Sequence, residues 1–262
     1  ADMLRRAMGK KIKSEMDAQR ERFVRGAVER GEAKADADMI FDLLAKFADY
    51  GFNKSHAAAY ALISYQTAWL KANYPVEFLA ASMSLELTNT DKLAEFRREA
   101  ARMGITISPP SVTTSGVRFE VANGAIHYAL AAVKGVGEEA ARAIVEARGA
   151  RPFASLTDFA ERGSPRAVNR RTYEQLVAAG AFDRLDKDRA KLIAGAERVL
   201  AHAASRESEA KSGQANFFGG GGADTIELPA AEPWTLVERL RREHAAVGFY
   251  LSGHPLDDYD EA

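Results

Sequence analysis

The stretch AVKGVGEEAA, residues 132–141, places an apolar residue between two glycines and an alanine four positions after the second glycine. This pattern is typical of a helix-hairpin-helix unit, because the glycines permit a tight turn and the apolar residue between them packs inward. The backbone N–H groups that begin the next helix then face outward, where the helix dipole favours a phosphate oxygen. Lys134, Gly135, Val136 and Gly137 are therefore predicted to hold a DNA backbone without reading its sequence.

Nearby charges support this interpretation in part and also leave an alternative open. Arg166, Arg170 and Arg171 would add phosphate contacts, which matter because non-specific binding depends on several of them. The alternative is that these arginines are solvated charges at a helix end. Glu138 and Glu139 would oppose a phosphate in the first turn, so the motif also fits a plain turn between two helices with packing glycines.

Helical periodicity precedes the motif. Apolar spacing and capping residues predict helices from Asp38 to Tyr50, from Ser55 to Ala72 and from Asn89 to Met103. One face of the middle helix is apolar, at Leu62, Tyr65, Trp69 and Ala72. Three helices of this kind predict a compact helical domain that ends near Ser108.

The period changes from about 3.6 to 2 over residues 117–130, and Asn123-Gly124 stands in the middle of that segment. This predicts a β-hairpin with a type I′ turn. Helices are then predicted over 138–148, 155–162 and 169–179. Residues 203–232 are rich in Ser, Glu, Ala and Gly, which predicts a flexible linker.

An aromatic pair stands inside this predicted linker. The residues are Gln214, Ala215, Asn216, Phe217 and Phe218. Paired aromatic side chains in a segment that forms no core call for a pocket on a partner protein. The alternative is a loop that folds back onto its own domain.

Charge is uneven along the chain. The formal net charge of the 262 residues is −1, yet the first thirty residues hold nine basic and five acidic side chains. Arg5, Arg6, Lys10 and Lys11 have the composition of a triphosphate or DNA-backbone contact, and the alternative is a solvated helix face. A second anion site is predicted at a turn that leads into a helix, with Lys54 and His56, although a lone His there is more often a cap or surface residue.

Several classes of function lack support in the sequence. The chain has no cysteine, which excludes disulfides and thiolate metal sites and fits a reducing cytoplasm. No apolar stretch approaches the roughly 20 residues of a membrane span. Asp36 and Asp38 stand at a helix start, where capping explains them better than a metal does. We therefore predict no metal site, no cofactor and no catalytic residue within these residues.

Six stretches together resemble the alpha subunits of bacterial DNA polymerase III across almost the whole chain. They are ADMLRRAMGKK (1–11), FADYGFNKSHAAAYALISYQTAWLKANYPVEFLAA (47–81), AVKGVGEEAARAIVEAR (132–148), NRRTYEQLVAAGAFDRL (169–185), QANFFG (214–219) and GFYLSGHPL (248–256). The opening residues read as the middle of an element, so we expect a piece of a longer protein.

The resemblance implies a mainly α fold with a small β-hairpin. Its parts would be a helical fingers fragment (1–108), a helix-hairpin-helix clamp-binding domain (109–202), a linker with the clamp motif (203–232) and a segment that leads toward an OB-fold outside the chain (233–262). It implies incoming-nucleotide contacts for Arg5, Arg6, Lys10, Lys11, Lys54 and His56. It also implies that residues 214–218 dock into the sliding clamp, although Phe217 stands where that motif usually has Leu or Met.

By the same resemblance, the full-length protein is a DNA-directed DNA polymerase. Its implied partners are the sliding clamp (beta subunit), primer–template DNA, the incoming deoxynucleoside triphosphate and other polymerase III holoenzyme subunits, with no membrane. Its Mg²⁺ would be held by palm carboxylates outside these residues, so the chain alone is expected to be inactive. Two alternatives remain: the error-prone alpha-subunit relative used in damage-induced synthesis, and a non-enzymatic helix-hairpin-helix adaptor.

Overall fold

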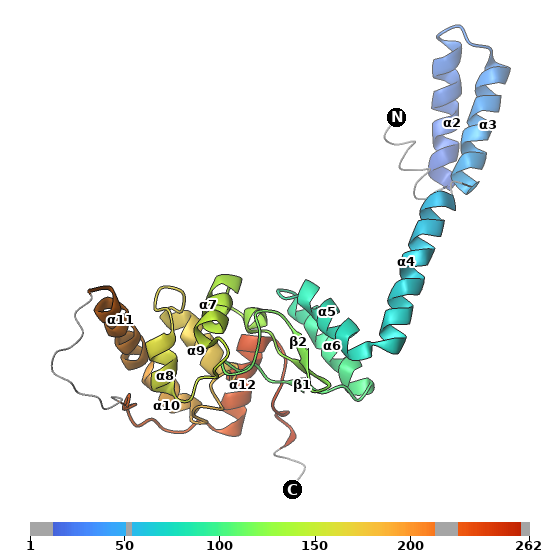
Figure 1. Cartoon of the computed structure of the whole chain (residues 1–262). Helices are drawn as coiled ribbons and strands as arrows, with labels where there is room; N and C mark the ends of the chain where they lie inside the picture. Colours follow the sequence, from blue (N-terminus) through green and yellow to red (C-terminus); the bar gives the residue numbers. More distant parts are fainter. Residues whose placement is uncertain (1–12, 51–53, 213–224, 258–262) are drawn as a thin grey trace. The chain divides into compact units, whose positions relative to one another are not determined.

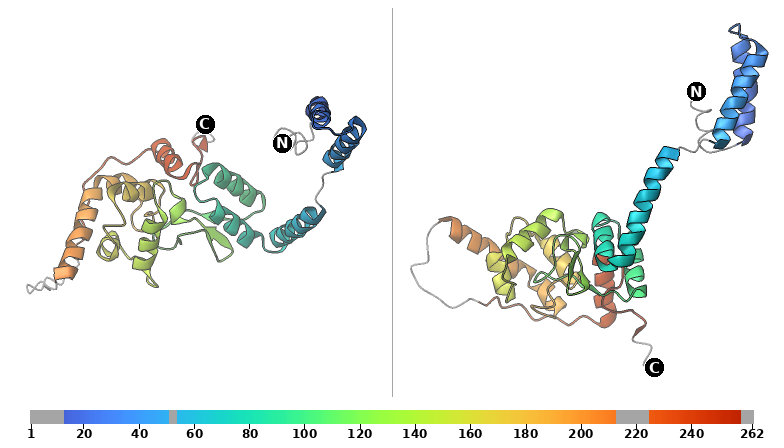
Figure 2. Two further views of the ribbon diagram at one scale, coloured as in Figure 1. Left: turned by 90° about the horizontal axis from the view of Figure 1, so that it is seen from above. Right: turned by 45° about the vertical axis from the view of Figure 1, so that its right-hand side comes forward.

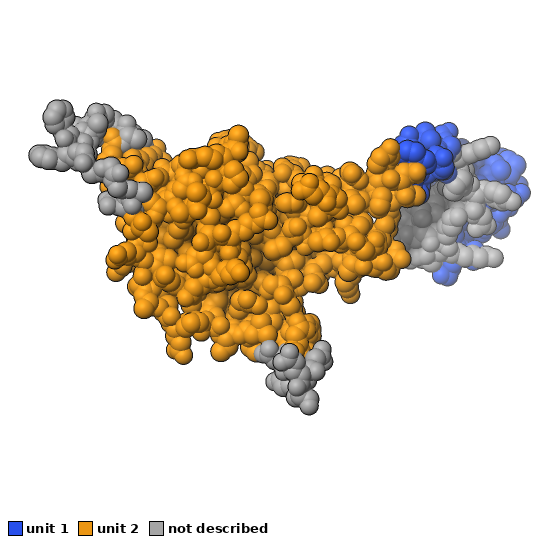
Figure 3. Space-filling view, turned by 60° about the horizontal axis from the view of Figure 1, so that its bottom comes forward, with its two compact units in different colours: residues 1–69 blue, residues 70–262 orange. Residues whose placement is uncertain are grey.

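The computed structural model describes residues 13–50, 54–212 and 225–257. Two compact units divide the chain, residues 1–69 (unit 1) and residues 70–262 (unit 2), and Figure 3 shows them in different colours. This division differs from the expected boundary near Ser108. No helix in the described ranges combines the length and the apolar character that a membrane crossing needs.

Unit 1 is built on a helical hairpin of α2 (Lys13–Val28) and α3 (Lys34–Tyr50), joined at Gly31, where φ is +91° (Figure 1). Phe41 is 1% exposed and its ring lies 5.5 Å from that of Phe23. Arg20 forms an ion pair of 3.1 Å with Asp38 and lies over the Phe41 ring. The predicted helix from Asp38 to Tyr50 is thus confirmed, with an earlier start.

The next helix, α4 (Lys54–Asn73), has an apolar face that lies exposed. Leu62 is 58% exposed, Tyr65 66% and Trp69 46%. The three upstream helices were expected to form one compact domain, whereas α6 shares its core with the strands of unit 2.

The first complete helices of unit 2 are α5 (Pro75–Leu85), which packs beside a small sheet, and α6 (Thr90–Arg102), which packs beside α5 (Figure 2). The Asn89 side chain caps α6 by accepting a hydrogen bond of 3.2 Å from the Lys92 N–H. The sheet order is β1 (Ile107–Ser108), β3 (Ala125–His127), β2 (Glu120–Ala122), with β1 parallel and β2 antiparallel to β3.

The predicted hairpin is confirmed, since Val121 pairs with Ile126 and the turn residues Asn123 and Gly124 have φ of +52° and +73°. Both residues of a type I′ turn need a positive φ, which is why Asn-Gly gives so clear a signal. The short strand β1 has no counterpart in the predictions.

The rest of unit 2 is helical. Its elements are the 3₁₀ turn η1 (Leu130–Ala132), α7 (Glu138–Arg148), α8 (Leu156–Arg162), α9 (Arg170–Ala178), α10 (Arg189–Ala194), α11 (Ala196–Ser212) and α12 (Leu236–Val247). Polar side chains at Ser155 and Asn169 cap α8 and α9. α11 packs beside α8, and α12 beside α9 (Figures 1 and 2). The mainly α fold with a small β-hairpin is confirmed.

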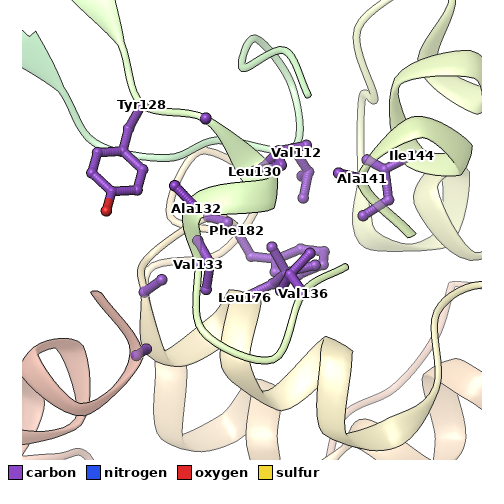
Figure 4. Packing of buried hydrophobic residues seen from close by; sticks show 14 of the residues in the cluster. Val112, Tyr128, Leu130, Ala132, Val133, Val136, Ala141, Ile144, Leu176 and Phe182 are labelled. Atoms are coloured by element: carbon purple, nitrogen blue, oxygen red, sulfur yellow. The ribbon is translucent and has the colours of Figure 1, made fainter. Parts of the chain in front are cut away.

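One continuous apolar core joins these elements. Figure 4 shows its centre, where Val136 lies close to Leu176 and Phe182. The Phe182 ring also contacts those of Phe159 at 4.8 Å and Tyr173 at 5.1 Å, in tilted or edge-on arrangements that aromatic pairs prefer.

The described part of the predicted linker, 203–232, is ordered into the domain. α11 continues to Ser212 because its apolar side chains, including Ala203 at 6% exposure, face the core. After residue 224, the Ile226 N–H donates to Thr157 Oγ1 at 3.1 Å, and Leu228 packs against the core. Both flanks of residues 213–224 are therefore fixed on unit 2.

Candidate nucleic-acid interface

The turn at residues 133–137 is anchored by two buried valines. Val133 is 1% exposed and Val136 is 4% exposed, and the Val136 N–H donates to the Val133 carbonyl at 3.0 Å. Gly135 has φ of +79°, a conformation that side chains disfavour. Val136 was predicted among the DNA-contacting residues, but its side chain is committed to the core, so only its backbone remains for a ligand.

The start of α7 is open to solvent. Gly137 is its N-cap, and no side chain accepts a hydrogen bond from the first turn. A Cβ placed on Gly137 would meet nothing within 4 Å. The first-turn N–H groups have no partner within the helix and carry the positive end of its dipole, so this surface suits an anion.

Two cations flank the turn. Lys134 is exposed, and its Nζ lies 3.4 Å from where a Cβ of Gly248 would stand. Arg171 Nε lies 3.7 Å from where a Cβ of Gly135 would stand. Among the described residues, no carboxylate lies within ion-pair distance of Lys134 or Arg171. Both charges therefore remain available to a ligand.

The other two predicted arginines are engaged elsewhere. Arg170 binds Glu174 at 2.8 Å and Glu197 at 2.5 Å, and the Glu174 hydrogen bond raises the pKa of its guanidinium. Arg166 lies 3.5 Å from Glu207. The structure thus separates the four predicted cations into a pair at the turn and a pair held by carboxylates.

One of the two acidic residues in the first turn of α7, Glu138, is partly neutralised. Glu138 lies 3.6 Å from Arg118 and 3.9 Å from Arg142, at separations typical of solvent-exposed ion pairs. Such pairs are individually weak, about 0.2–1 kcal/mol, but both place a guanidinium near the Glu138 carboxylate. The objection that Glu138 would repel a phosphate is correspondingly reduced.

The predicted nucleotide site is described only at one residue. The predicted contacts of Arg5, Arg6, Lys10 and Lys11 lie outside the described residues, as does the side chain of Lys54. His56 is exposed in the first turns of α4, and its ring lies 4.3 Å from that of Tyr60. The predicted clamp motif, residues 214–218, also lies outside the described residues.

The predictions missed a buried ion pair that supports the turn from behind. Arg189 (5% exposed) donates to Asp183 at 2.6 Å and to Glu243 (1% exposed) at 3.3 Å. Burial lowers the pKa of Arg189, but the two carboxylates outweigh it and raise that pKa above its ordinary value. A Cβ on Gly180 would lie 2.3 Å from Arg189 Nη2, so glycine is required there.

Through this pair, α12 becomes part of the interface. Glu243 Oε1 accepts hydrogen bonds from the N–H groups of Leu251 at 2.8 Å and Ser252 at 2.7 Å. The Ala246 carbonyl accepts from the Lys134 N–H at 2.8 Å, so α12 bonds directly to the turn. Arg189 and Glu243 are 54 residues apart, and no local pattern could have paired them.

Known proteins share both the motif and the surrounding sequence. A family model described as "Helix-hairpin-helix motif" matches residues 104–192. The chain is 55% identical to "DNA polymerase III subunit alpha" of Caulobacter vibrioides over 260 residues, which is 98% of this chain and 23% of the relative. It is 50% identical to the protein of the same name from Thermus aquaticus over 262 residues, 99% of this chain and 21% of the relative. The chain thus spans less than a quarter of the length of these relatives.

Proposed function

Because this chain is homologous, along nearly its whole length, to a segment of the DNA polymerase III alpha subunits, we propose that it serves a replicative DNA polymerase by holding DNA and tying the enzyme to its clamp. The observation that carries the DNA-binding part is the turn at Gly135, flanked by two exposed cations and an open helix N-terminus. The family model over residues 104–192 supports it.

The turn suits the backbone of duplex DNA. A phosphate oxygen can accept from the first N–H groups of α7, while Lys134 and Arg171 meet neighbouring phosphates on either side. None of these groups distinguishes one base from another. A few such contacts give weak binding that falls as salt displaces the protein from the DNA.

The clamp-binding part rests on residues 214–218. In this proposal, Gln214 hydrogen-bonds and the Phe217 and Phe218 side chains fill an apolar cleft on the sliding clamp. Support comes from the described flanks, because α11 and residues 226–228 are both held on unit 2. Two buried Phe side chains contribute about 1.5–3 kcal/mol each, less the ordering cost, so the isolated peptide is expected to bind weakly, on the order of millimolar.

The activity that the chain serves is proposed to be template-directed DNA synthesis. The residues proposed to meet the incoming nucleotide are those of the basic start with Lys54 and His56, and the metal-binding carboxylates would come from other parts of the polymerase. The aromatic pair at Phe217-Phe218 favours the replicative form over the error-prone relative.

The test of DNA binding compares two double variants with the same change in charge. We expect Lys134→Ala with Arg171→Ala to weaken binding to a blunt DNA duplex and to lower the slope of log affinity against log salt by about 2. Arg166→Ala with Arg170→Ala serves as the matched control and is expected to change both quantities less, because these arginines already bind carboxylates. Fluorescence anisotropy over a range of salt concentrations measures both. Equal losses in the two variants would assign binding to general charge and not to the turn.

A further inference from the structure

A second basic surface of unit 2 is a pocket of about 630 Å³ between α6 and the segment that follows α12. Arg97 and Arg98 of α6 line it together with His244, Tyr250 and His254. Its volume is within the range of about 300–1,000 Å³ that is usual for ligand sites. Neither Lys134 nor Arg171 lines it, so it is distinct from the hairpin turn.

Three ring side chains form one wall of the pocket. The Tyr250 ring lies 4.8 Å from that of His244 and 5.5 Å from that of His254. The wall is held in place by its backbone, because Glu243 binds the N–H groups of residues 251 and 252. The His254 N–H is fixed as well, since it donates to Asp257 Oδ2 at 2.6 Å. Such a surface offers ring faces at fixed positions.

The other wall carries positive charge. Arg97 lies over the Phe249 ring at 5.7 Å, which orients its guanidinium. Within the described part of the chain, no carboxylate lies within ion-pair distance of Arg97 or Arg98. Asp257, the acidic residue of the pocket lining, already accepts the backbone hydrogen bond from His254. The pocket therefore combines fixed rings with two available cations.

We propose that this pocket binds a nucleotide unit of single-stranded DNA, with the base stacked on Tyr250 and its phosphate held by Arg97 and Arg98. Aromatic faces beside a positive groove are the means by which proteins hold single strands, since every base has a face to stack. A base in a duplex has both faces covered by its neighbours, so an unpaired nucleotide is required. The choice of DNA rests on the proposed function, whereas the nucleotide chemistry follows from the pocket.

The experiment uses the whole 262-residue chain with a fluorescently labelled oligothymidylate. We expect Tyr250→Ala to weaken binding by about 5- to 150-fold, the loss that follows from removing one stacking ring. Tyr250→Phe keeps the ring and is expected to bind like the unaltered chain. Arg98→Ala is expected to lower the salt slope by about 1. Arg241→Ala is the matched control, because Arg241 is exposed on α12 but lies outside the pocket.

A blunt duplex separates this inference from the hairpin proposal. The pocket variants are expected to bind the duplex normally, whereas the Lys134 and Arg171 variant is expected to bind it poorly. Unchanged oligothymidylate binding by Tyr250→Ala, or no binding by the unaltered chain, overturns the pocket proposal and leaves the hairpin standing. Loss of duplex binding alone overturns the hairpin. If dTMP displaces the oligothymidylate at the same concentration of nucleotide, the pocket binds a free nucleotide, and the proposal of a single-stranded ligand is overturned.

Discussion

At the scale of single residues, the two glycines of the motif have different roles. The sequence predicts that both are required by a tight turn, but only Gly135 has a positive φ, at +79°. Gly137 has φ of −72°, which any residue adopts, and open space beyond its Cα. Gly135 therefore shapes the turn, while Gly137 keeps its outer surface clear.

This difference predicts opposite results for two alanine substitutions. Gly135→Ala is expected to lower the free energy of unfolding by about 1–2 kcal/mol, because the Cβ of alanine is too close to the backbone carbonyl at positive φ. Gly137→Ala is expected to change stability by less than 1 kcal/mol and to weaken duplex binding nonetheless, because its methyl group would stand before the first N–H groups of α7. Denaturant unfolding and DNA titration of both variants measure the two effects. If Gly137→Ala binds DNA as the unaltered chain does, the open N-terminus is not the phosphate site.

Residues whose roles are local were predictable from the sequence. Asn89, Ser155 and Asn169 cap the helices that follow them, because a capping side chain bonds an N–H within three residues. Asn123-Gly124 predicted the hairpin because these two residue types tolerate a positive φ, which is also a local property. Among the described residues, Arg166 and Arg170 bind carboxylates, whereas Lys134 and Arg171 do not. This difference depends on contacts across the fold, so it could not be predicted from the sequence.

At the scale of elements, α12 is held to the hairpin unit by a charge pair inside the core. The helices lie where the apolar periodicity predicted them. The periodicity did not predict which elements they pack against. α6 was assigned to the upstream helices, although its Leu93 and Ala100 are buried in the core of unit 2. Amphipathic spacing identifies a face to be buried and says nothing of which surface buries it.

The buried pair predicts an unequal response to removal of its two members. Arg189→Met leaves Glu243 and Asp183 without their cation, and we expect a loss of about 3–5 kcal/mol in the free energy of unfolding. Glu243→Gln is expected to cost less, because Asp183 still neutralises Arg189. Arg241→Met, an exposed change on the same helix, is the control.

Unfolding midpoints and hydrogen exchange of the α12 amides check this prediction. Protection of α12 is expected to fall first in Arg189→Met, ahead of α7 and α8. If Glu243→Gln lowered the free energy of unfolding more than Arg189→Met, then Glu243 and its hydrogen bonds to residues 251 and 252 would stabilise α12 more than the arginine does.

At the scale of the whole molecule, a net charge of −1 coexists with two local surfaces that suit phosphates. The proposed clamp tether adds a third contact, which does no chemistry but raises the concentration of the enzyme near DNA. Replacement of Gln214, Phe217 and Phe218 by Ala is expected to abolish clamp binding and leave the thermal melt nearly unchanged. In the full-length polymerase, the same change is expected to reduce long-tract synthesis far more than single-nucleotide addition.

Gel filtration with the purified clamp and a thermal melt of the variant check the tether. If the two Phe side chains instead pack into their own domain, their loss would cost about 3–5 kcal/mol each and the variant would melt early. A variant that binds the clamp as the unaltered chain does would remove the tether from the proposed function.

The buried pair also bears on how the chain folds as it is made. A ribosome releases the N-terminal side first, so Arg189 exists for 54 residues of synthesis before Glu243 follows it. During that interval Asp183, which lies six residues earlier in the chain, is already present as its partner. In the nascent chain, Asp183 can thus neutralise Arg189 before α12 has been synthesised. Glu243 then completes the ion pair when α12 packs onto the domain.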